Sequence, residues 1–313
     1  MSRARGRTLT EHHPSGRQIS LGFDDQELTI VEVGGGIRSY TIGGLPVIDG
    51  YAEDAMCSGG RGQILAPWPN RIDGGRYKWR GANMQLALTE PARANANHGL
   101  VRWANWTLER VDDARATATL TLHPQPGYPF TLSLLVEYTL DAGGVTVTTT
   151  ASNIGADTAP LGIGFHPYLV AGTARIDYAR ITLAAAEVLE ADERGIPTGA
   201  RTVPHDARLA LEGTTVGARV FDHCYTGLPR DDHGVARATV ESEDRRVTLW
   251  MDDAFDFAMV FTGDTLPQGQ RRRSIAIEPM TCAPNAFNSG EGLITLEPGA
   301  THTSRWGLSA ARA

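Results

Sequence analysis

Apolar and polar side chains alternate with a period of two residues along most of this chain. In residues 116–122 alanine and leucine alternate with threonine, and residues 131–140 repeat the pattern with leucine, valine and tyrosine. A DAGG turn at 141–144 then leads into VTVTTTAS at 145–152. Alternating, β-branched runs joined by turn residues are typical of half-buried antiparallel strands. This pattern predicts β-hairpins rather than helices.

The same alternation returns at short intervals, whereas helical periodicity is scarce. The best helix candidate, residues 184–195, is equally compatible with a strand and a turn. Many short strands in one chain predict an all-β fold, a large antiparallel β-sandwich or barrel in which distant strands share a sheet. We expect a frayed N-terminal segment at 1–20 and a single domain at 21–313. The further predicted strands are 77–80, 85–88, 106–111, 180–183, 238–242, 246–250, 256–261, 274–278 and 293–297.

The charge balance of the chain argues against polyanionic partners. The 313 residues contain 29 Lys and Arg against 36 Asp and Glu, a formal net charge of −7. A net negative surface disfavours nucleic acid and anionic membranes. The basic runs at 3–7 and 271–273 are short and isolated, and we interpret them as part of the frayed terminus and a solvated turn.

The three cysteines, Cys57, Cys224 and Cys282, are odd in number and far apart, without CxxC spacing. This pattern argues against a disulfide framework and a zinc site and indicates a reducing compartment. No apolar leader follows Met1, and no apolar run approaches about 18 residues, the length of a membrane-spanning helix. We therefore expect a cytoplasmic protein.

Four stretches interrupt the alternation with dense polar chemistry: 65–81, 95–106, 163–170 and 274–292. Each places a reactive side chain at a strand-to-loop junction beside proline or glycine. These side chains are Arg71, His98, His166 and Glu278.

Each of these residues alone has an ordinary structural interpretation. His98 and His166 fit satisfied core or loop histidines, Arg71 fits an ion-pair partner, and Glu278 fits a solvated strand end. Trp103 and Trp106 fit core positions. Their joint occurrence where the regular pattern fails favours a functional site.

Five blocks in order extend this observation to nearly the whole chain, from about residue 28 to 308. They read LAPWPNRIDGGRY, NHGLVRW, GFHPYLV, FDHCY and IEPMTCAPNAFNSGEGLITLEPG. Together they resemble the aldose 1-epimerase family, the galactose mutarotases. The resemblance implies a galactose mutarotase-like supersandwich, a large antiparallel β-sandwich. It also implies a free hexose of the glucose or galactose type as the monosaccharide substrate, and neither a cofactor nor a metal.

The resemblance implies roles for particular positions of this sequence. Glu278 matches the general base, His166 the general acid, and His98 a second active-site histidine. The substrate-binding positions that it implies are Arg71, Asp222, Asn70 and Tyr168.

The implied reaction explains why a carboxylate and an imidazole are needed. To interconvert α and β anomers, the C1 hydroxyl loses a proton while the ring oxygen gains one. Ordinary pKa values of about 4.3 and 6.5 leave a window in which Glu278 is ionised and His166 protonated. We expect nearby carboxylates to raise the pKa of His166 and extend that window to neutral pH. We also expect the two groups to face each other across the sugar, each contributing about 10²–10⁴-fold.

Three alternatives stay open. A hexose-6-phosphate mutarotase would need basic residues for the phosphate, and Arg93 or Arg102 are candidates. A non-catalytic sugar-binding protein would not require both Glu278 and His166. A glycoside hydrolase would ordinarily pair two carboxylates. We expect a monomer or a homodimer.

Overall fold

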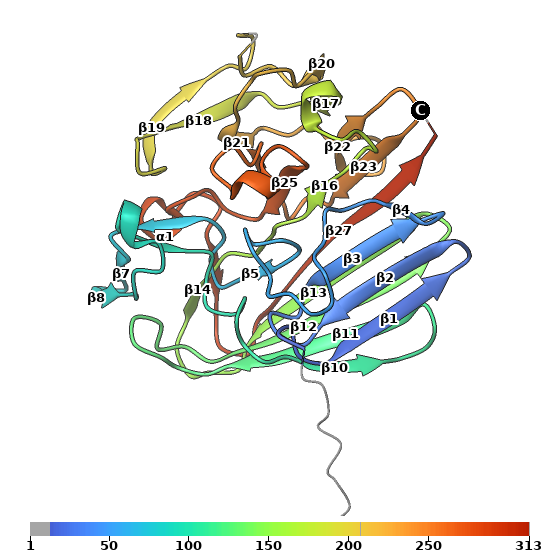
Figure 1. The fold of residues 1–313 in the computed structure, drawn as a ribbon. Coiled ribbons are helices and arrows are strands. Elements are labelled where there is room, and N and C mark those ends of the chain that lie inside the picture. Colours follow the sequence, from blue (N-terminus) through green and yellow to red (C-terminus); the bar gives the residue numbers. More distant parts are fainter. Residues whose placement is uncertain (1–12, 207, 313) are drawn as a thin grey trace, which may run out of the picture.

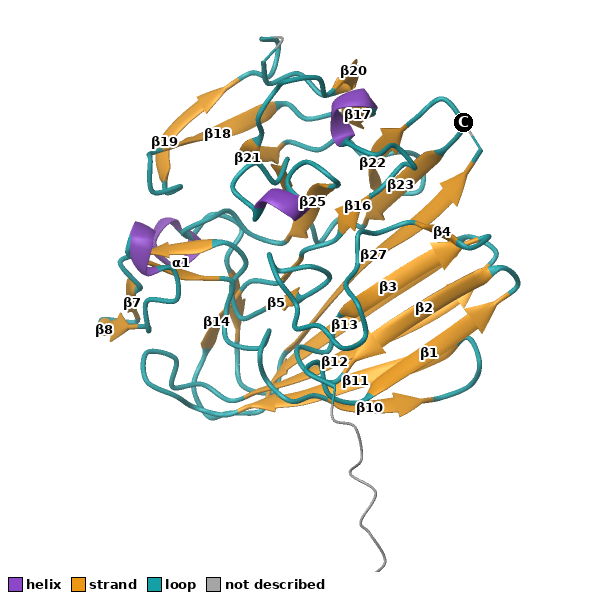
Figure 2. Cartoon of the chain, viewed as in Figure 1, coloured by secondary structure: helices purple, strands orange, loops and turns teal. Residues whose placement is uncertain are grey.

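The computed structural model describes residues 13–206 and 208–312 (Figure 1). Most of the expected frayed segment, 1–20, lies outside the described residues, and β1 (Gln18–Phe23) begins within its last part. The chain consists mainly of strands and loops (Figure 2), which confirms the predicted all-β class. Among the described residues no helix has the length and apolarity needed to cross a membrane. The single-domain boundary at 21–313 stays a prediction.

Two large antiparallel sheets organise the molecule, one of nine and one of eight strands. Across the first lie β10 (Thr107–Arg110), β11 (Arg115–Leu122), β12 (Leu132–Asp141), β13 (Gly144–Asn153), β27 (Thr301–Ala311), β23 (Arg246–Met251), β22 (Ala236–Glu241), β17 (Arg180–Leu183) and β20 (Glu212–Thr215). Across the second lie β19 (Pro197–Thr202), β18 (Glu187–Ala191), β21 (Asp222–Thr226), β24 (Phe257–Phe261), β25 (Ile275–Met280), β15 (Gly164–Phe165) and β5 (Ile64–Leu65), and β16 (Tyr168–Leu169) also pairs with β25.

Smaller elements cover these sheets. A four-stranded sheet of β1, β2 (Gln26–Val31), β3 (Ile37–Ile42) and β4 (Leu45–Pro46) packs through β1 on β10, β11 and β12 (Figure 1). The two-stranded sheets are β14 (Ala159–Leu161) with β26 (Ile294–Leu296), β6 (Arg71–Asp73) with β9 (Asn95–Asn97), and β7 (Arg76–Trp79) with β8 (Ala82–Gln85). The helices are α1 (Ala286–Ser289) and the 3-10 turns η1 (Pro91–Arg93), η2 (Ile176–Tyr178) and η3 (Gln268–Gln270).

The β12–β13 hairpin shows why the alternation predicted strands correctly. Its two strands pair from Leu132↔Asn153 to Asp141↔Gly144, so the predicted turn at 141–144 closes the hairpin. Along both strands buried side chains alternate with more accessible ones, most of them half-buried, because successive side chains of a strand point to opposite faces. The ambiguous stretch 184–195 forms β18 followed by a turn rather than a helix.

One continuous apolar core joins the two large sheets. It contains Val136 from β12, Ile277 from β25 and Trp306 from β27. The rings of Phe165 and Trp306 lie 5.0 Å apart, so β27 of the first sheet supports β15 of the second. Because Phe165 points into this core, the next residue, His166, points to the opposite face.

Candidate active site

The cavity that contains the predicted residues is built around β25 of the eight-stranded sheet. All six of its residues are buried. On one side β24 pairs Met259 with Glu278, and on the other β15 and β16 pair with the two ends of β25. Residues 166 and 167 form the break between β15 and β16, where Pro167 lacks an N–H for the ladder. The break therefore places the His166 side chain beside Glu278.

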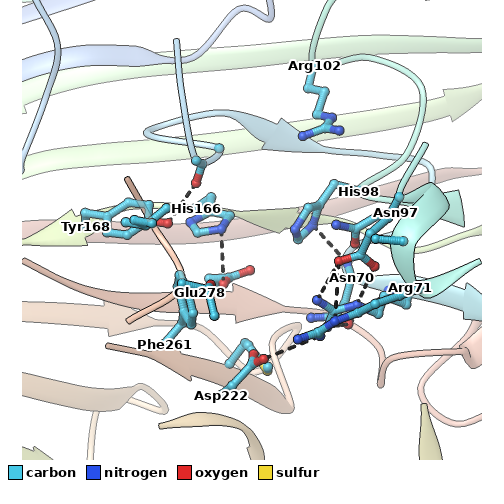
Figure 3. A pocket seen from close by; sticks show the side chains of 18 of the residues that line it. Asn70, Arg71, Asn97, His98, Arg102, His166, Tyr168, Asp222, Phe261 and Glu278 are labelled. Atoms are coloured by element: carbon cyan, nitrogen blue, oxygen red, sulfur yellow. Dashed lines mark hydrogen bonds and ion pairs between the residues drawn. The ribbon is translucent and has the colours of Figure 1, made fainter. Parts of the chain in front are cut away.

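His166 and Glu278 are in direct contact. His166 Nε2 lies 3.3 Å from Glu278 Oε1, and both side chains are at least nine-tenths buried (Figure 3). The expectation that these groups face each other across a ligand is therefore wrong. Within the described part of the chain, His166 Nδ1 and Glu278 Oε2 are buried without a hydrogen-bond partner. Buried polar atoms are nearly always paired, so these two are available to a polar ligand.

Burial controls the protonation of the pair. It raises the pKa of Glu278 well above its ordinary value, and the Asp222 charge adds to this effect while Arg71 opposes it. Burial also lowers the pKa of His166 to about 3; the backbone of His166 itself opposes this shift, and the Arg102 and Arg61 charges reinforce it. The expected rise in the pKa of His166 is thus wrong, because desolvation of the ring outweighs nearby carboxylates. The pair therefore favours a neutral form with one proton between Oε1 and Nε2.

His98 is held by Asn70 through pairing of β6 with β9, which sets Arg71 opposite Asn97. Both His98 and Asn70 have positive φ, 61° and 55°. The Asn70 amide donates to His98 Nδ1 over 3.2 Å, so in the neutral ring the proton is on Nε2. Burial lowers the pKa of His98 well below its ordinary value, with the His166, Arg102 and Arg71 charges adding to the effect. The site therefore holds His98 as a neutral donor.

Tyr168 contributes packing rather than a titrating group. Its ring stacks on His166, with centroids 4.9 Å apart and 12° between the planes. Its hydroxyl donates to the Gly59 carbonyl over 2.8 Å. On the other side the His98 ring packs edge-on against His166, with the two ring centroids 5.4 Å apart. The two rings therefore fix the orientation of His166.

Arg71 is oriented by Glu90, which sequence reasoning missed. Arg71 Nε and Nη2 donate to the two Glu90 carboxylate oxygens over 2.8 and 3.1 Å. Burial alone would lower the pKa of Arg71, but Glu90, Asp222 and Glu278 outweigh it, and the pKa is raised. Arg93 from η1 lies 3.6 Å from Asp222 and 4.0 Å from Glu90. Both Glu90 and Glu278 are followed directly by a proline. This shared Glu-Pro pair is a sequence signal that could have identified Glu90.

All seven predicted site residues line one cavity of about 390 Å³, the size range of small-molecule sites. Arg93 and Arg102, which the sequence analysis named only as candidates for a phosphate, line it too. Trp103 also lines it and is about half exposed, so its assignment to the core is wrong. Sequence reasoning missed Gly59, Gly60, Glu90, Ala92, Asn97, Met259, Phe261, Thr265 and Leu266.

Three donor side chains of the cavity have the chemistry for acid–base transfer and could also hold a metal ion. Among the described residues, ligand atoms of His98, His166 and Glu278 lie within 4.8 Å of one another. Two histidines and one carboxylate are a donor set that zinc accepts. The three cysteines are free and buried. The contact between a carboxyl group and an imidazole, open to a polar cavity, equips the site to move protons on a hydroxyl-rich ligand.

Relatives of known structure share this fold. A galactose mutarotase-like protein from Clostridium acetobutylicum superposes with a TM-score of 0.84 at 19% identity, covering 97% of this chain and 98% of that one. The galactose 1-epimerase from Lactobacillus acidophilus superposes with a TM-score of 0.82 at 17% identity, and the match covers 95% of this chain and 94% of that one. At these identities the likeness concerns the fold.

Sequence comparison identifies the family. The chain is 35% identical over 298 residues to the uncharacterized protein YihR of Escherichia coli, covering 94% of this chain and 93% of that protein. It is 29% identical over 170 residues to human galactose mutarotase, covering 52% of this chain and 48% of that protein. The family model described as Aldose 1-epimerase matches residues 17–309. The chain therefore belongs to the aldose 1-epimerase family.

Proposed function

We propose that this protein interconverts the α and β anomers of a free aldose by acid–base opening and closing of the sugar ring. The observation that carries the proposal is the buried contact of His166 Nε2 with Glu278 Oε1, with the other polar atom of each group left for a ligand. The seven residues implied by the family resemblance support it because they line one cavity.

The contact suits a hemiacetal because the two oxygens that exchange protons are both attached to C1. When the shared proton of the pair is on His166, Glu278 as carboxylate takes the proton of the C1 hydroxyl, and His166 as imidazolium gives its proton to the ring oxygen. Ring opening converts the pair into carboxylic acid and neutral imidazole, so the pair keeps one proton. Rotation about the C1–C2 bond exposes the other face of the aldehyde, and the reverse transfers close the ring.

The remaining residues position the sugar. His98 donates from Nε2, and Arg71, oriented by Glu90, donates from the guanidinium edge that Glu90 leaves free. Asp222, 3.6 Å from Arg93, accepts from sugar hydroxyls. Asn70 and Tyr168 complete the wall, and the half-exposed Trp103 offers an apolar face for the ring. We place this activity in the cytoplasm, and the free state of the three cysteines supports a reducing compartment.

Polarimetry tests the proposal. Fresh α-glucose and α-galactose are followed with wild-type protein, with Glu278→Gln and without protein. The proposal expects catalysed mutarotation of at least one aldose by the wild type only. A protein that binds these sugars in calorimetry yet leaves the rotation at its uncatalysed rate would instead be a sugar-binding protein.

A further inference from the structure

Arg102 differs from the other arginines of the cavity because its charge has no counterion. Its guanidinium forms neither a hydrogen bond nor an ion pair with any residue of 13–206 or 208–312. Within these residues its one aromatic contact is with Trp103, where the Arg102 Cζ atom lies 5.7 Å from the centroid of the ring. Arg71 is bound by Glu90, and Arg93 lies 3.6 Å from Asp222. Figure 3 shows Arg102 directed at the region of His166 and His98, from the side opposite Asp222.

This cation is partly withdrawn from water. Burial lowers the pKa of Arg102, which the Cys57 and Glu90 charges oppose. An arginine that loses hydration without gaining a partner is unfavourable in the free protein. Its planar fork matches the oxygens of an anionic group, so a ligand anion would offset this cost.

The reaction geometry indicates where that anion lies on the sugar. With the C1 hydroxyl at Glu278, the ring oxygen is at His166. The carbon on the other side of the ring oxygen is C5, which carries the exocyclic C6 in a hexopyranose. The Arg102 charge contributes to the lowered pKa of both His166 and His98. Because Figure 3 shows Arg102 directed at the region of these two rings, we place the C6 substituent on the Arg102 side of His166.

We propose, on the basis of the proposed function, that the aldose bound here carries a singly charged anionic group on C6, held by the guanidinium of Arg102. One unpaired cation matches one negative charge. The carboxylates of Asp222 and Glu90 line the same cavity and repel excess negative charge. A phosphate monoester carries about −1.5 to −2 at neutral pH, whereas a carboxylate or a sulfonate carries a single charge.

Four substrates test this assignment: glucose, glucuronate, glucose 6-phosphate and 6-deoxy-6-sulfoglucose. We expect kcat/KM of at least one monoanion to exceed that of glucose by tenfold or more. Arg102→Gln should reduce this ratio at least tenfold, and Arg102→Lys should retain part of it. The matched control is Arg80→Gln, an exposed arginine paired with Glu297 that does not line the cavity, and it should keep the ratio.

The outcomes separate this inference from the proposed function. If glucose is turned over as well as the monoanions, or if Arg102→Gln keeps the ratio, the anionic assignment is overturned while the mutarotase proposal stands. A preference for glucose 6-phosphate overturns the assignment of a singly charged group.

If no sugar is turned over, the proposed function fails. Calorimetric titration of glucose and the three anionic sugars into wild type and Arg102→Gln then tests the role of Arg102 alone. Equal binding of glucose and the monoanions, or no binding, overturns it. Melting curves identify any variant that fails to fold.

Discussion

The amide of Asn70 donates to His98 Nδ1, and the amide of His98 donates in return to the Asn70 carbonyl over 2.8 Å. This reciprocal pair joins the turn before β6 to the turn after β9, and both residues adopt positive φ to form it. Because Nδ1 is occupied as an acceptor, the neutral ring presents Nε2–H to the cavity. The backbone thus determines the tautomer of the His98 side chain.

The first prediction follows from that tautomer. His98→Gln removes a fixed neutral donor, and we expect kcat to fall by about 10²-fold, as when one stabilising donor is lost. The pH at which kcat declines on the acid side should stay the same, because the pKa of His98 is already far below its ordinary value. A shifted acid limb of the pH–rate profile would show that His98 itself transfers a proton.

The second prediction concerns the acid–base pair. Glu278→Gln and His166→Asn should each lower kcat by about 10²–10⁴-fold, the typical contribution of one proton-transfer group. The double variant should lose little more than either single variant, since the two groups act as a unit. Polarimetry supplies the rates, and far-UV circular dichroism checks the fold. Additive losses would contradict a shared proton.

The third prediction is a pH dependence of stability with opposite contributions from the two partners. The pKa of His166 falls on folding, from an ordinary 6.5 to about 3. Between these values the unfolded chain binds more protons, so His166 stabilises the native state above pH 6.5 and loses that contribution as the pH falls. The pKa of Glu278 rises on folding, so its contribution is largest at low pH and is lost as the pH rises through the raised pKa.

Urea unfolding between pH 4.5 and 7.5 measures these contributions. As the pH is lowered, we expect the free energy of unfolding to fall less steeply in His166→Asn than in the wild type. In Glu278→Gln it should fall more steeply than in the wild type. Each difference is at most about 1.4 kcal/mol per pH unit, the value for one proton. Equal slopes in all three proteins would show that the pKa of neither His166 nor Glu278 changes on folding.

The sequence was sufficient for the fold class but insufficient for the register of distant strands. Alternation predicted β12 and β13 because the side-chain period follows from the backbone of each strand. The pairing of β13 with β27, Thr149 opposite Ser304, joins segments from the middle and the end of the chain. No local pattern encodes such a register.

The site shows the same division between local and tertiary information. The residues proposed to supply the chemistry stand at junctions visible in the sequence, and the family resemblance implied their roles. The direct contact of His166 with Glu278 depends on the pairing of β15 and β16 with the two ends of β25, and the protonation of both groups depends on their burial. Sequence reasoning therefore assigned ordinary charge states where the fold reverses the shifts.

The fourth prediction concerns Glu90 as a positioning residue. Glu90→Gln leaves one acceptor for a guanidinium that now donates to two carboxylate oxygens. We expect KM of the sugar to rise roughly fivefold with kcat nearly unchanged, since about 1 kcal/mol of coupling corresponds to that factor. The control is Glu297→Gln, whose bond to Arg80 is exposed. If kcat falls and KM stays constant, Glu90 acts on the transition state rather than through Arg71.

The fifth prediction tests how tightly the wall of the cavity holds His166. A Cβ on Gly60 would lie 2.6 Å from His166 Cδ2, and the stacked Tyr168 ring blocks retreat of the imidazole. Gly60→Ala should therefore displace the ring and lower kcat by about 10²-fold, the effect of a misplacement near 1 Å. The control is Gly44→Ala, with a similar φ of +74° and nothing within 4 Å of the added Cβ. It should lose roughly 1–2 kcal/mol of stability from left-handed strain alone and keep full activity. Equal kcat values for the two variants would contradict the close contact between the Gly60 loop and His166.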